Sequence, residues 1–348
     1  MKKLSIQIFF LLVSYFHSGH AGKIVQCIAN WQIDAAPYTQ ILQANGYDAK
    51  VVVTNIQDYD SDLLIRNGSF YKLLRKCGLD FSFHASIPED VKKIIFFNID
   101  SRTTKRRDLS RFPKEKLILF MWEPKTVLPD MYLQKIQDCF SKIYTWDDSL
   151  VDGKLYFKFH YPAYAQRLNQ IPSFGEKKLC TLVASNLTSN FEYELYSERR
   201  AAIHYFESVH EEGFEFYGRG WNVATTPSYR GAINDKLETI KNYRFSICYE
   251  NTAKSSGYVT EKIFDCFAAG TVPIYWGPDN IEEYVPKEAF ISRSDFLSLE
   301  ELHLFIKSMP QDVYEGYLIQ AQAFLESDAA KKFTWERFAQ DFYQSILY

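Results

Sequence analysis

Short apolar runs alternate with segments of helical periodicity along most of this chain. Strands are predicted where β-branched, aliphatic and aromatic residues follow one another, and helices where apolar residues recur at every third or fourth position. The predicted strands span residues 24–28, 51–53, 93–97, 117–122, 141–145, 179–183, 214–217, 244–249 and 271–276. The predicted helices span residues 37–44, 70–77, 192–209, 235–241, 259–269, 299–309, 314–325 and 335–347. This alternation is typical of an α/β fold with parallel sheets and helices on both faces.

Residues 161–178 interrupt this pattern. They contain Pro162, Pro172 and Gly175 and show no periodicity, so they are predicted to connect two domains. A chain of 348 residues is also too long for one ordinary hydrophobic core. The predicted parts are an N-terminal domain at 22–162, a linker at 163–178, a C-terminal domain at 179–330 and a terminal helical segment at 331–348.

The N-terminal residues 1–21 have the features of a targeting segment. Lys2 and Lys3 precede an apolar stretch over residues 4–16, and small residues follow before Gly22. The apolar stretch is short, because a membrane-spanning helix requires about 20 residues. Residues 1–21 are therefore predicted to be either a cleaved signal peptide or a short membrane anchor. After Gly22, no other segment is long and apolar enough to cross a membrane.

Charge and cysteine content argue against two classes of function. The net charge is −3, so a nucleic-acid partner has no electrostatic support. The six cysteines are scattered without a Cys-x-x-Cys pair, so no metal site is predicted and buried free thiols are expected. Their even number also allows a disulfide in an oxidising compartment. No Asp-x-Asp motif ends a predicted strand, and both Asp147-Asp148 and Asp58-Tyr59-Asp60 are predicted to be turn residues.

The strongest functional signal lies between residues 244 and 278. A buried strand is followed by a small, polar loop over residues 251–257, then by a helix that Gly270 ends, and then by a second buried strand. The polar residues gather at the end of the first strand and the start of the helix. In an open α/β sheet this edge is where ligands bind, and a helix N-terminus that carries a lysine suits a phosphate or diphosphate.

An ordered set of residues around this strand and helix carries a family resemblance. Glu250-Asn251, then Tyr258-x-Thr260-Glu261-Lys262, and then Gly270-x-Val272-Pro273 resemble the donor-binding signature of the alpha-1,3-fucosyltransferase family. The resemblance extends more weakly over residues 116–296, whereas residues 23–115 match no family. It implies the GT-B fold, in which two Rossmann-like domains face each other across a cleft. In such folds the last helix, here residues 335–348, often returns to the first domain.

The resemblance also implies a reaction. L-fucose would move from GDP-β-L-fucose to a hydroxyl of an oligosaccharide or glycoconjugate, expected to be the 3-hydroxyl of GlcNAc or Glc, to form an α-1,3 linkage. The configuration inverts, so a single displacement needs a general base at the acceptor and positive groups at the departing diphosphate. No cofactor and no metal are implied. The N-terminal domain would hold the acceptor, and the C-terminal domain would hold GDP-fucose.

Glu123 is the predicted general base. It follows the strand predicted at 117–122 and precedes Pro124, which pushes it out of any helix. A carboxylate at the carboxyl edge of a parallel sheet would point into the cleft, and it is ionised near neutral pH. The family that the chain resembles has its catalytic glutamate at the matching place.

The donor-binding residues implied by the resemblance lie in the signature and in the helix predicted at 192–209. Arg200 would contact the diphosphate, although the neighbouring Arg199 is an alternative one position away. Lys262 would oppose the diphosphate charge, and Glu261 would accept hydrogen bonds from sugar or ribose hydroxyls. The full set is Arg200, Asn251, Tyr258, Glu261 and Lys262, with Glu250, Arg219 and Asn186 as weaker candidates.

Two other hypotheses remain open from the sequence. One is a GT-B glycosyltransferase with a different nucleotide-sugar donor or linkage, and the other is a glycan-binding protein on the same fold without turnover. Intact Glu123 and Lys262 favour the enzyme, because a binding protein does not need both. With its N-terminal segment, the protein is expected in the secretory pathway or at a membrane. This means a Golgi-type lumen in a eukaryote, and the cell envelope or membrane in a bacterium.

Overall fold

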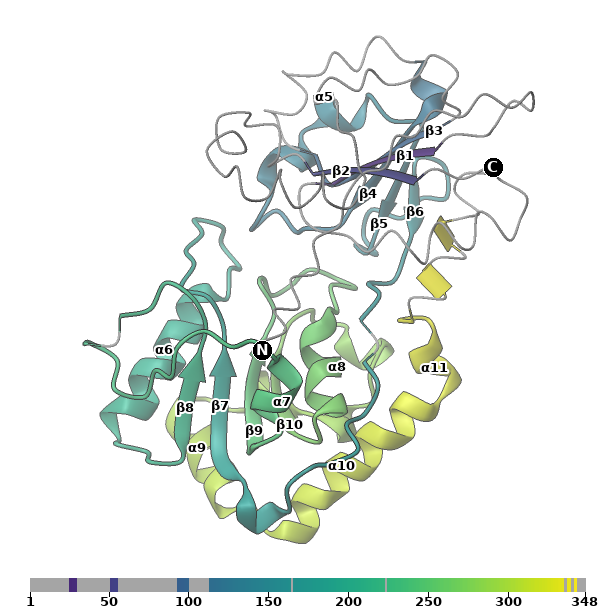
Figure 1. The fold of residues 1–348 in the computed structure, drawn as a ribbon. Helices are drawn as coiled ribbons and strands as arrows, with labels where there is room; N and C mark the ends of the chain where they lie inside the picture. Colours follow the sequence, from purple (N-terminus) through teal and green to yellow (C-terminus); the bar gives the residue numbers. More distant parts are fainter. Residues whose placement is uncertain are drawn as a thin grey trace, which may run out of the picture. The chain divides into compact units, whose positions relative to one another are not determined.

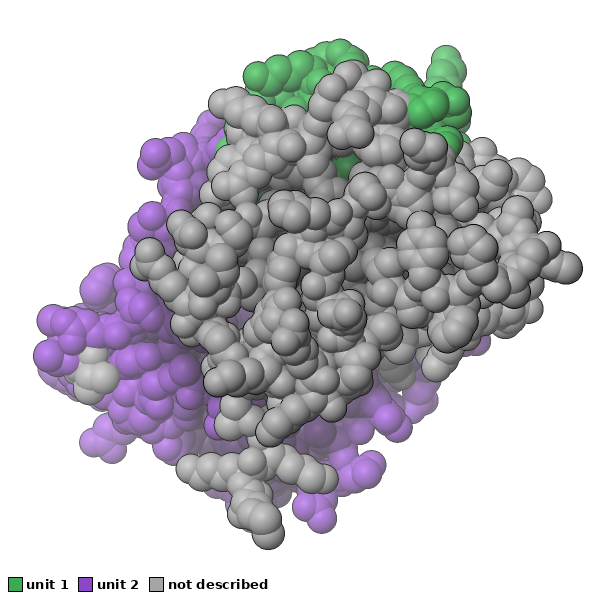
Figure 2. Space-filling view, turned by 45° about the horizontal axis from the view of Figure 1, so that its top comes forward, with its two compact units in different colours: residues 1–145, 150–159, 339–348 green, residues 146–149, 160–338 purple. Residues whose placement is uncertain are grey.

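The computed structural model describes residues 25–29, 51–55, 93–99, 113–334 except 164 and 223, 337–338 and 341–342. The chain divides into two compact units, which Figure 2 colours green and purple. The first contains residues 1–145, 150–159 and 339–348, and the second contains residues 146–149 and 160–338. The predicted targeting segment at 1–21 and the helices predicted at 37–44 and 70–77 lie outside the described residues.

The first unit is built on a parallel sheet, in which six strands are described in the order β2-β1-β3-β4-β5-β6. These strands are β1 (Val25–Ala29), β2 (Val51–Asn55), β3 (Lys93–Phe97), β4 (Leu117–Met121), β5 (Lys142–Thr145) and β6 (Tyr156–Lys158). Short helical segments accompany them: η3 (Lys114–Lys116), η4 (Pro129–Tyr132) and α5 (Gln134–Gln137). Every residue of β4 is buried, and Leu117, Leu119 and Met121 belong to the same core as Phe96 and Phe140.

The second unit contains a parallel sheet whose described strands follow the order β11-β10-β9-β7-β8. Figure 1 labels the neighbouring strands β10, β9, β7 and β8. The strands are β7 (Lys178–Val183), β8 (Phe214–Tyr217), β9 (Tyr243–Tyr249), β10 (Val272–Trp276) and β11 (Ile291–Ser292). The helices are α6 (Tyr196–Ser208), α7 (Lys236–Ile240), α8 (Glu261–Ala268), α9 (Leu299–Ser308), α10 (Gln311–Glu326) and α11 (Asp328–Lys331). The short 3-10 helices are η5 (Phe174–Glu176), η6 (Ile281–Glu283), η7 (Lys287–Ala289) and η8 (Arg293–Asp295).

Two apolar cores form in the second unit because successive side chains of a strand point to opposite faces of the sheet. In β9, Ile247 packs into the core that contains α6 and α9, whereas Cys248 packs into the core that contains α7 and α8. Helix α10 contributes to both cores. Two parallel sheets with helices packed on them confirm the predicted α/β class.

Two helices of the second unit begin later than predicted, for local reasons. Helix α8 starts at Glu261, because Thr260 is still extended at φ −113° and ψ −173°. Helix α6 starts at Tyr196, and the Glu194 carboxylate accepts hydrogen bonds from the backbone N–H groups of Tyr196 and Ser197. In the part of the chain that the structure describes, no helix is both long and apolar enough to cross a membrane.

Candidate active site

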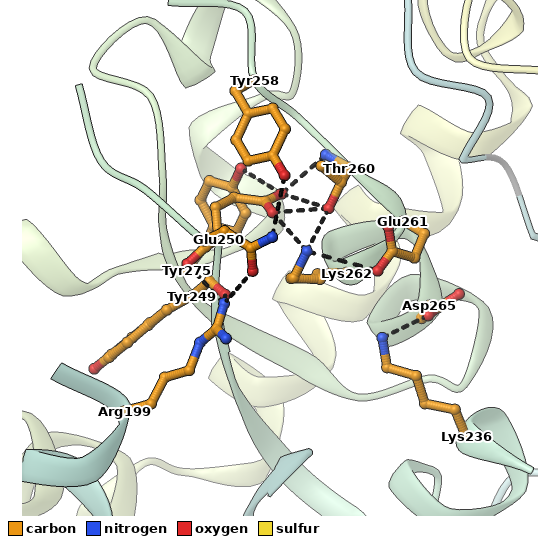
Figure 3. A network of polar contacts seen from close by, with 11 residues as sticks. Arg199, Lys236, Tyr249, Glu250, Tyr258, Thr260, Glu261, Lys262, Asp265 and Tyr275 are labelled. Carbon is orange, nitrogen blue, oxygen red and sulfur yellow. Dashed lines mark hydrogen bonds and ion pairs between the residues drawn. The ribbon is translucent and has the colours of Figure 1, made fainter. Parts of the chain in front are cut away.

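The candidate site surrounds Glu250, the first residue after β9. Its carboxylate is fully buried, and it accepts hydrogen bonds from the backbone N–H and the hydroxyl of Thr260, each at 2.9 Å (Figure 3). The hydroxyl of Tyr275 donates a further hydrogen bond at 3.2 Å. A buried carboxylate is tolerated only when it is hydrogen-bonded and paired with a positive charge. Thr260 and Tyr275 supply the hydrogen bonds. Glu250, a weaker candidate from the sequence, is therefore the centre of the described network.

Lys262 supplies the countercharge for this buried carboxylate. Its Nζ lies 2.9 Å from Glu250 Oε2 and 2.9 Å from the hydroxyl of Thr260. Burial acts to lower the pKa of Lys262, but the negative charges of Glu250 and Glu261 outweigh it and raise the pKa. The side chain keeps 19% of its surface exposed. Lys262 therefore remains an ammonium ion at the first turn of α8, with part of its surface open to a ligand.

Glu261 stays ionised beside this lysine. Its carboxylate lies 3.6 Å from Lys262 Nζ, and the side chain is 45% exposed. Partial removal of the carboxylate from water acts to raise its pKa. The positive charges of Lys262 and Lys236 outweigh this effect and lower the pKa to about 2. Lys236 itself pairs with Asp265 at 2.7 Å on the next turn of α8. An exposed, ionised carboxylate of this kind accepts hydrogen bonds from hydroxyl groups.

The two neighbouring arginines of α6 have different environments. The Nη2 of Arg199 donates hydrogen bonds to the carbonyls of Tyr249 and Glu250, at 2.6 and 2.7 Å, and to Asn251 Oδ1 at 3.1 Å (Figure 3). Arg199 is buried, which lowers its pKa, but a guanidinium remains charged in a protein. Arg200 instead donates a hydrogen bond to the carbonyl of Leu187. The structure thus brings Arg199, and not Arg200, to the signature residues.

Tyr258 is a fixed, buried part of the site. Only 1% of its surface is exposed, and its ring lies 4.5 Å from the ring of Trp146 and 6.5 Å from that of Tyr161. Asn251 Nδ2 donates a hydrogen bond to its hydroxyl at 3.4 Å. The Tyr258 hydroxyl therefore holds the Asn251 amide, and the ring does not project into solvent.

The loops after β7 and β8 lie side by side at the same edge of the sheet. The backbone N–H of Asn186 donates a hydrogen bond to the carbonyl of Arg219 at 2.8 Å, and its side-chain amide donates one to the carbonyl of Gly220 at 3.2 Å. Gly218 has φ +143°, and a Cβ atom there would lie 1.8 Å from the carbonyl oxygen of Ala184, so the contact requires glycine. Arg219 is exposed and forms no ion pair within the described ranges.

Glu123 lies in the first unit, two residues beyond the last residue of β4. Its backbone N–H and that of Trp122 both donate to the side-chain oxygen of Asn98, at 3.0 and 2.8 Å. Asn98 is fully buried and has φ +60°, a conformation that asparagine tolerates better than most residues. Tyr132 also donates its hydroxyl to the Glu123 carbonyl, at 3.0 Å. Sequence reasoning missed Asn98, although an asparagine directly after an apolar strand was a signal.

Two cationic side chains, those of Lys262 and Arg199, contact Glu250. Within residues 113–334 and the shorter described segments, no cluster of three His, Cys, Asp or Glu side chains could hold a metal ion. Lys262 pairs with the carboxylate of Glu250, and Arg199 donates a hydrogen bond to its backbone carbonyl (Figure 3). The arrangement can bind an anionic group near α8 and hydroxyl groups near Glu261 and Asn251.

Comparison with known sequences identifies relatives of this site. Residues 175–332 match the family model described as "Glycosyltransferase family 10 (fucosyltransferase) C-term". An alpha-(1,3)-fucosyltransferase of Helicobacter pylori is 36% identical over 88 residues, which are 25% of this chain and 18% of the relative. The human 4-galactosyl-N-acetylglucosaminide 3-alpha-L-fucosyltransferase 9 is 29% identical over 147 residues, which are 41% of this chain and 36% of the relative. The matches thus span less than two fifths of the length of these relatives.

Comparison with solved structures extends over both units. An alpha1,3-fucosyltransferase with GDP aligns with a TM-score of 0.51 and 16% identity, covering 97% of this chain and 94% of that one. The BGT of phage T4 in complex with its UDP-glucose substrate aligns with a TM-score of 0.53 and 12% identity, covering 93% and 99%. At these identities the likeness concerns the fold alone, and it confirms the predicted GT-B class.

Proposed function

We propose that this protein is an alpha-1,3-fucosyltransferase that uses GDP-β-L-fucose, because residues 175–332 match the family model described as "Glycosyltransferase family 10 (fucosyltransferase) C-term". The observation that carries the proposal is the Glu250–Lys262 pair at the first turn of α8. The buried carboxylate keeps the ammonium charged and fixes its direction. The first turn of a helix offers free backbone N–H groups to an anion, and a fixed ammonium adds a positive charge. Together they suit a diphosphate.

Arg199 is the better candidate for a second contact to the diphosphate. Its guanidinium already lies against Asn251 and the carbonyl of Glu250, whereas Arg200 bonds to the carbonyl of Leu187. Two cationic groups at the departing diphosphate would stabilise the charge that develops as the bond to fucose breaks. In this proposal, Asn251 and the ionised Glu261 accept hydrogen bonds from hydroxyls of the ribose or the fucose.

The transfer itself follows from the predicted roles. The acceptor oxygen forms a bond to C1 of fucose from the face opposite the diphosphate, while the bond from C1 to the diphosphate oxygen breaks and the configuration inverts. Glu123 receives the proton of the acceptor hydroxyl. The GDP that leaves carries away the electron pair, and its charge is met by Lys262 and Arg199. Asn98 holds the backbone of Glu123 at the end of β4.

The acceptor and the location of the enzyme follow from the same proposal. The acceptor is the 3-hydroxyl of GlcNAc or Glc in an oligosaccharide or glycoconjugate, and residues of the first unit bind it. The name of the human relative refers to transfer of fucose to the 3-position of a galactosyl-N-acetylglucosaminide, which supports this acceptor class. The enzyme acts in the secretory pathway or at a membrane, with its N-terminal segment as signal or anchor.

Nucleotide selectivity tests the proposal. The purified protein is titrated with GDP and, separately, with UDP while its thermal unfolding is followed. A ligand at ten times its dissociation constant stabilises the folded state by about 1.4 kcal/mol. We expect stabilisation by GDP and none by UDP, and then transfer of fucose from GDP-fucose to an N-acetyllactosamine acceptor. Equal stabilisation by UDP would refute the choice of donor, and GDP-fucose binding without transfer would indicate a binding protein.

A further inference from the structure

Four residues between β5 and β6 have an unusual place in the chain. Residues 146–149 cluster with the second unit, although the residues on either side of them belong to the first. We call them the 146–149 segment. The sequence predicted that Asp147 and Asp148 are turn residues. Residues 148–150 form a turn, and the carboxylate of Asp147 accepts hydrogen bonds there from the backbone N–H and the hydroxyl of Ser149, at 3.0 and 2.6 Å.

Asp148 contacts the signature loop. One carboxylate oxygen, Oδ2, accepts hydrogen bonds from the hydroxyl of Ser256 at 3.1 Å, from Asn280 Nδ2 at 3.0 Å and from the hydroxyl of Tyr284 at 2.6 Å. The backbone N–H of Asp148 donates to the carbonyl of Ser256 at 3.2 Å. Asn280 in turn accepts a hydrogen bond from the backbone N–H of Gly257 at 3.0 Å.

The same segment supports Tyr258. The ring of Trp146, which is almost fully buried, lies 4.5 Å from the ring of Tyr258. The beginning of the loop is held separately, by a bridge between Thr252 and Glu194 and by a hydrogen bond from the N–H of Ala253 to the carbonyl of Tyr193 at 2.8 Å. The 146–149 segment therefore fixes the end of the loop that leads into Thr260 and Lys262.

The loop needs such support because its own residues are small and polar. Lys254 and Gly257 have φ of +53° and +80°, in the left-handed region that most residues avoid. A segment with few apolar side chains does not bury enough surface to offset the entropy lost on ordering. Contacts from outside the loop must therefore supply the missing stabilisation. The Asp148 carboxylate is an effective partner, because hydrogen bonds to a carboxylate are stronger than those to a neutral acceptor.

We propose that Asp148 is a positioning residue of the donor site. It preorganises residues 255–258, so that Tyr258 supports the Asn251 amide in the geometry that the nucleotide sugar requires. The inference rests on the proposed function, because it assigns the loop to the donor. Asp148 acts through Ser256, Asn280 and Tyr284 and does not itself touch the donor.

The test compares Asp148→Asn with Asp147→Asn, a matched change one residue away. An amide oxygen at position 148 carries no full charge, so its hydrogen bonds to Ser256, Asn280 and Tyr284 are weaker than those of the carboxylate, and the loop is held less firmly. We expect the Kd for GDP and the KM for GDP-fucose to rise about tenfold in Asp148→Asn, because preorganisation acts on binding. We expect kcat to stay within about threefold and Asp147→Asn to match the wild type.

Two further variants keep the test decisive if Asp148→Asn folds poorly. Tyr284→Phe removes one of the three donors and keeps the ring, and Ser256→Ala removes another. Each should raise the Kd by a smaller factor, and combining Tyr284→Phe with Asp148→Asn should add little, because both remove the same interaction. Hydrogen exchange should be faster at the amide of Gly257 in Asp148→Asn than in Asp147→Asn.

The outcomes separate this inference from the proposed function. If the wild type binds GDP and Asp148→Asn binds it equally well, the inference is wrong and the proposed function stands. The inference is also wrong if kcat falls while the KM is unchanged, since that pattern points to the chemistry. If the wild type does not bind GDP, the proposed function fails, and the donor role of Asp148 fails with it.

Discussion

The ammonium of Lys262 lies 2.9 Å from a carboxylate oxygen of Glu250, and that carboxylate has no exposed surface. A buried charge of this kind persists only with its partner, since removing one member leaves the other unpaired in a medium of low polarity. The pair therefore serves the fold and, in our proposal, also the diphosphate. Separating these two roles is the purpose of the first prediction.

Replacing Lys262 by methionine should lower both stability and donor affinity. The free energy of unfolding should fall by about 3–5 kcal/mol, because Glu250 remains buried without a partner. Denaturant titration measures this loss, and calorimetry measures the Kd for GDP. The matched control is the double variant Glu250→Gln/Lys262→Met, which should recover most of the stability and none of the affinity. Recovery of GDP binding in the double variant would show that Lys262 does not face the diphosphate.

The second prediction distinguishes the two adjacent arginines of α6. Arg199→Lys keeps a positive charge but cannot reproduce the contacts to the carbonyls of Tyr249 and Glu250 and to Asn251. We expect the Kd for GDP to rise at least tenfold in Arg199→Lys and less than twofold in Arg200→Lys. Thermal unfolding of both variants shows how much of the effect comes from lost stability. The opposite ranking would return the diphosphate contact to Arg200.

The third prediction tests the general base. Glu123→Gln keeps the size and polarity of the side chain but cannot take a proton. Fucose transfer should fall by about 10²–10⁴-fold, and GDP binding should be unchanged because the donor residues lie elsewhere. The pH profile of the variant should also lack its acidic limb. A variant that keeps most of its activity, with the limb intact, would mean that the base is another carboxylate.

A fourth prediction concerns Lys177, a buried lysine whose ammonium donates a hydrogen bond to the carbonyl of Gly270. Burial, with a smaller contribution from the charge of Arg167, lowers its pKa to about 7. The unfolded chain keeps an ordinary pKa near 10.5. Between these values the unfolded state binds a proton that the folded state does not. The contribution of Lys177 to stability should therefore rise with pH, by up to about 1.4 kcal/mol per pH unit.

Urea unfolding at pH 6, 7, 8 and 9 measures this dependence. The stability of the wild type relative to Lys177→Met should be lowest at pH 6 and should increase through pH 9. Lys178→Met is a control on the neighbouring residue, whose side chain is 51% exposed and pairs with Glu215 at 2.8 Å. Parallel curves for the wild type and Lys177→Met would contradict the lowered pKa.

The bounds of several strands could be predicted from the sequence, because these strands consist mostly of consecutive apolar residues. Strands β7, β9 and β10 begin and end within one residue of their predicted bounds, because their buried residues follow one another without a break. Strands β6 and β11 were missed. They contain three and two residues, too few for any pattern, and they are recognised only by their pairing with β5 and β10.

The site was predictable where its residues are close in sequence and not where they meet through the fold. Glu250, Asn251, Glu261 and Lys262 are separated by a single loop. Adjacent residues of a helix point about 100° apart, so Arg199 and Arg200 cannot be told apart until the buried face of α6 is known. Asp148 lies in a turn, as predicted, but its contacts could not be predicted because its partners are 108, 132 and 136 positions further along the chain.

The path of the chain between the units also constrains protein engineering. The chain changes unit after residues 145, 149, 159 and 338, so the second unit is not one continuous stretch. A chimaera that exchanges only residues 160–338 with a homologous enzyme would combine Asp148 from one parent with Ser256, Asn280 and Tyr284 from the other. A transplant intended to change the donor should therefore carry residues 146–149 along with the domain, as a second, four-residue insert.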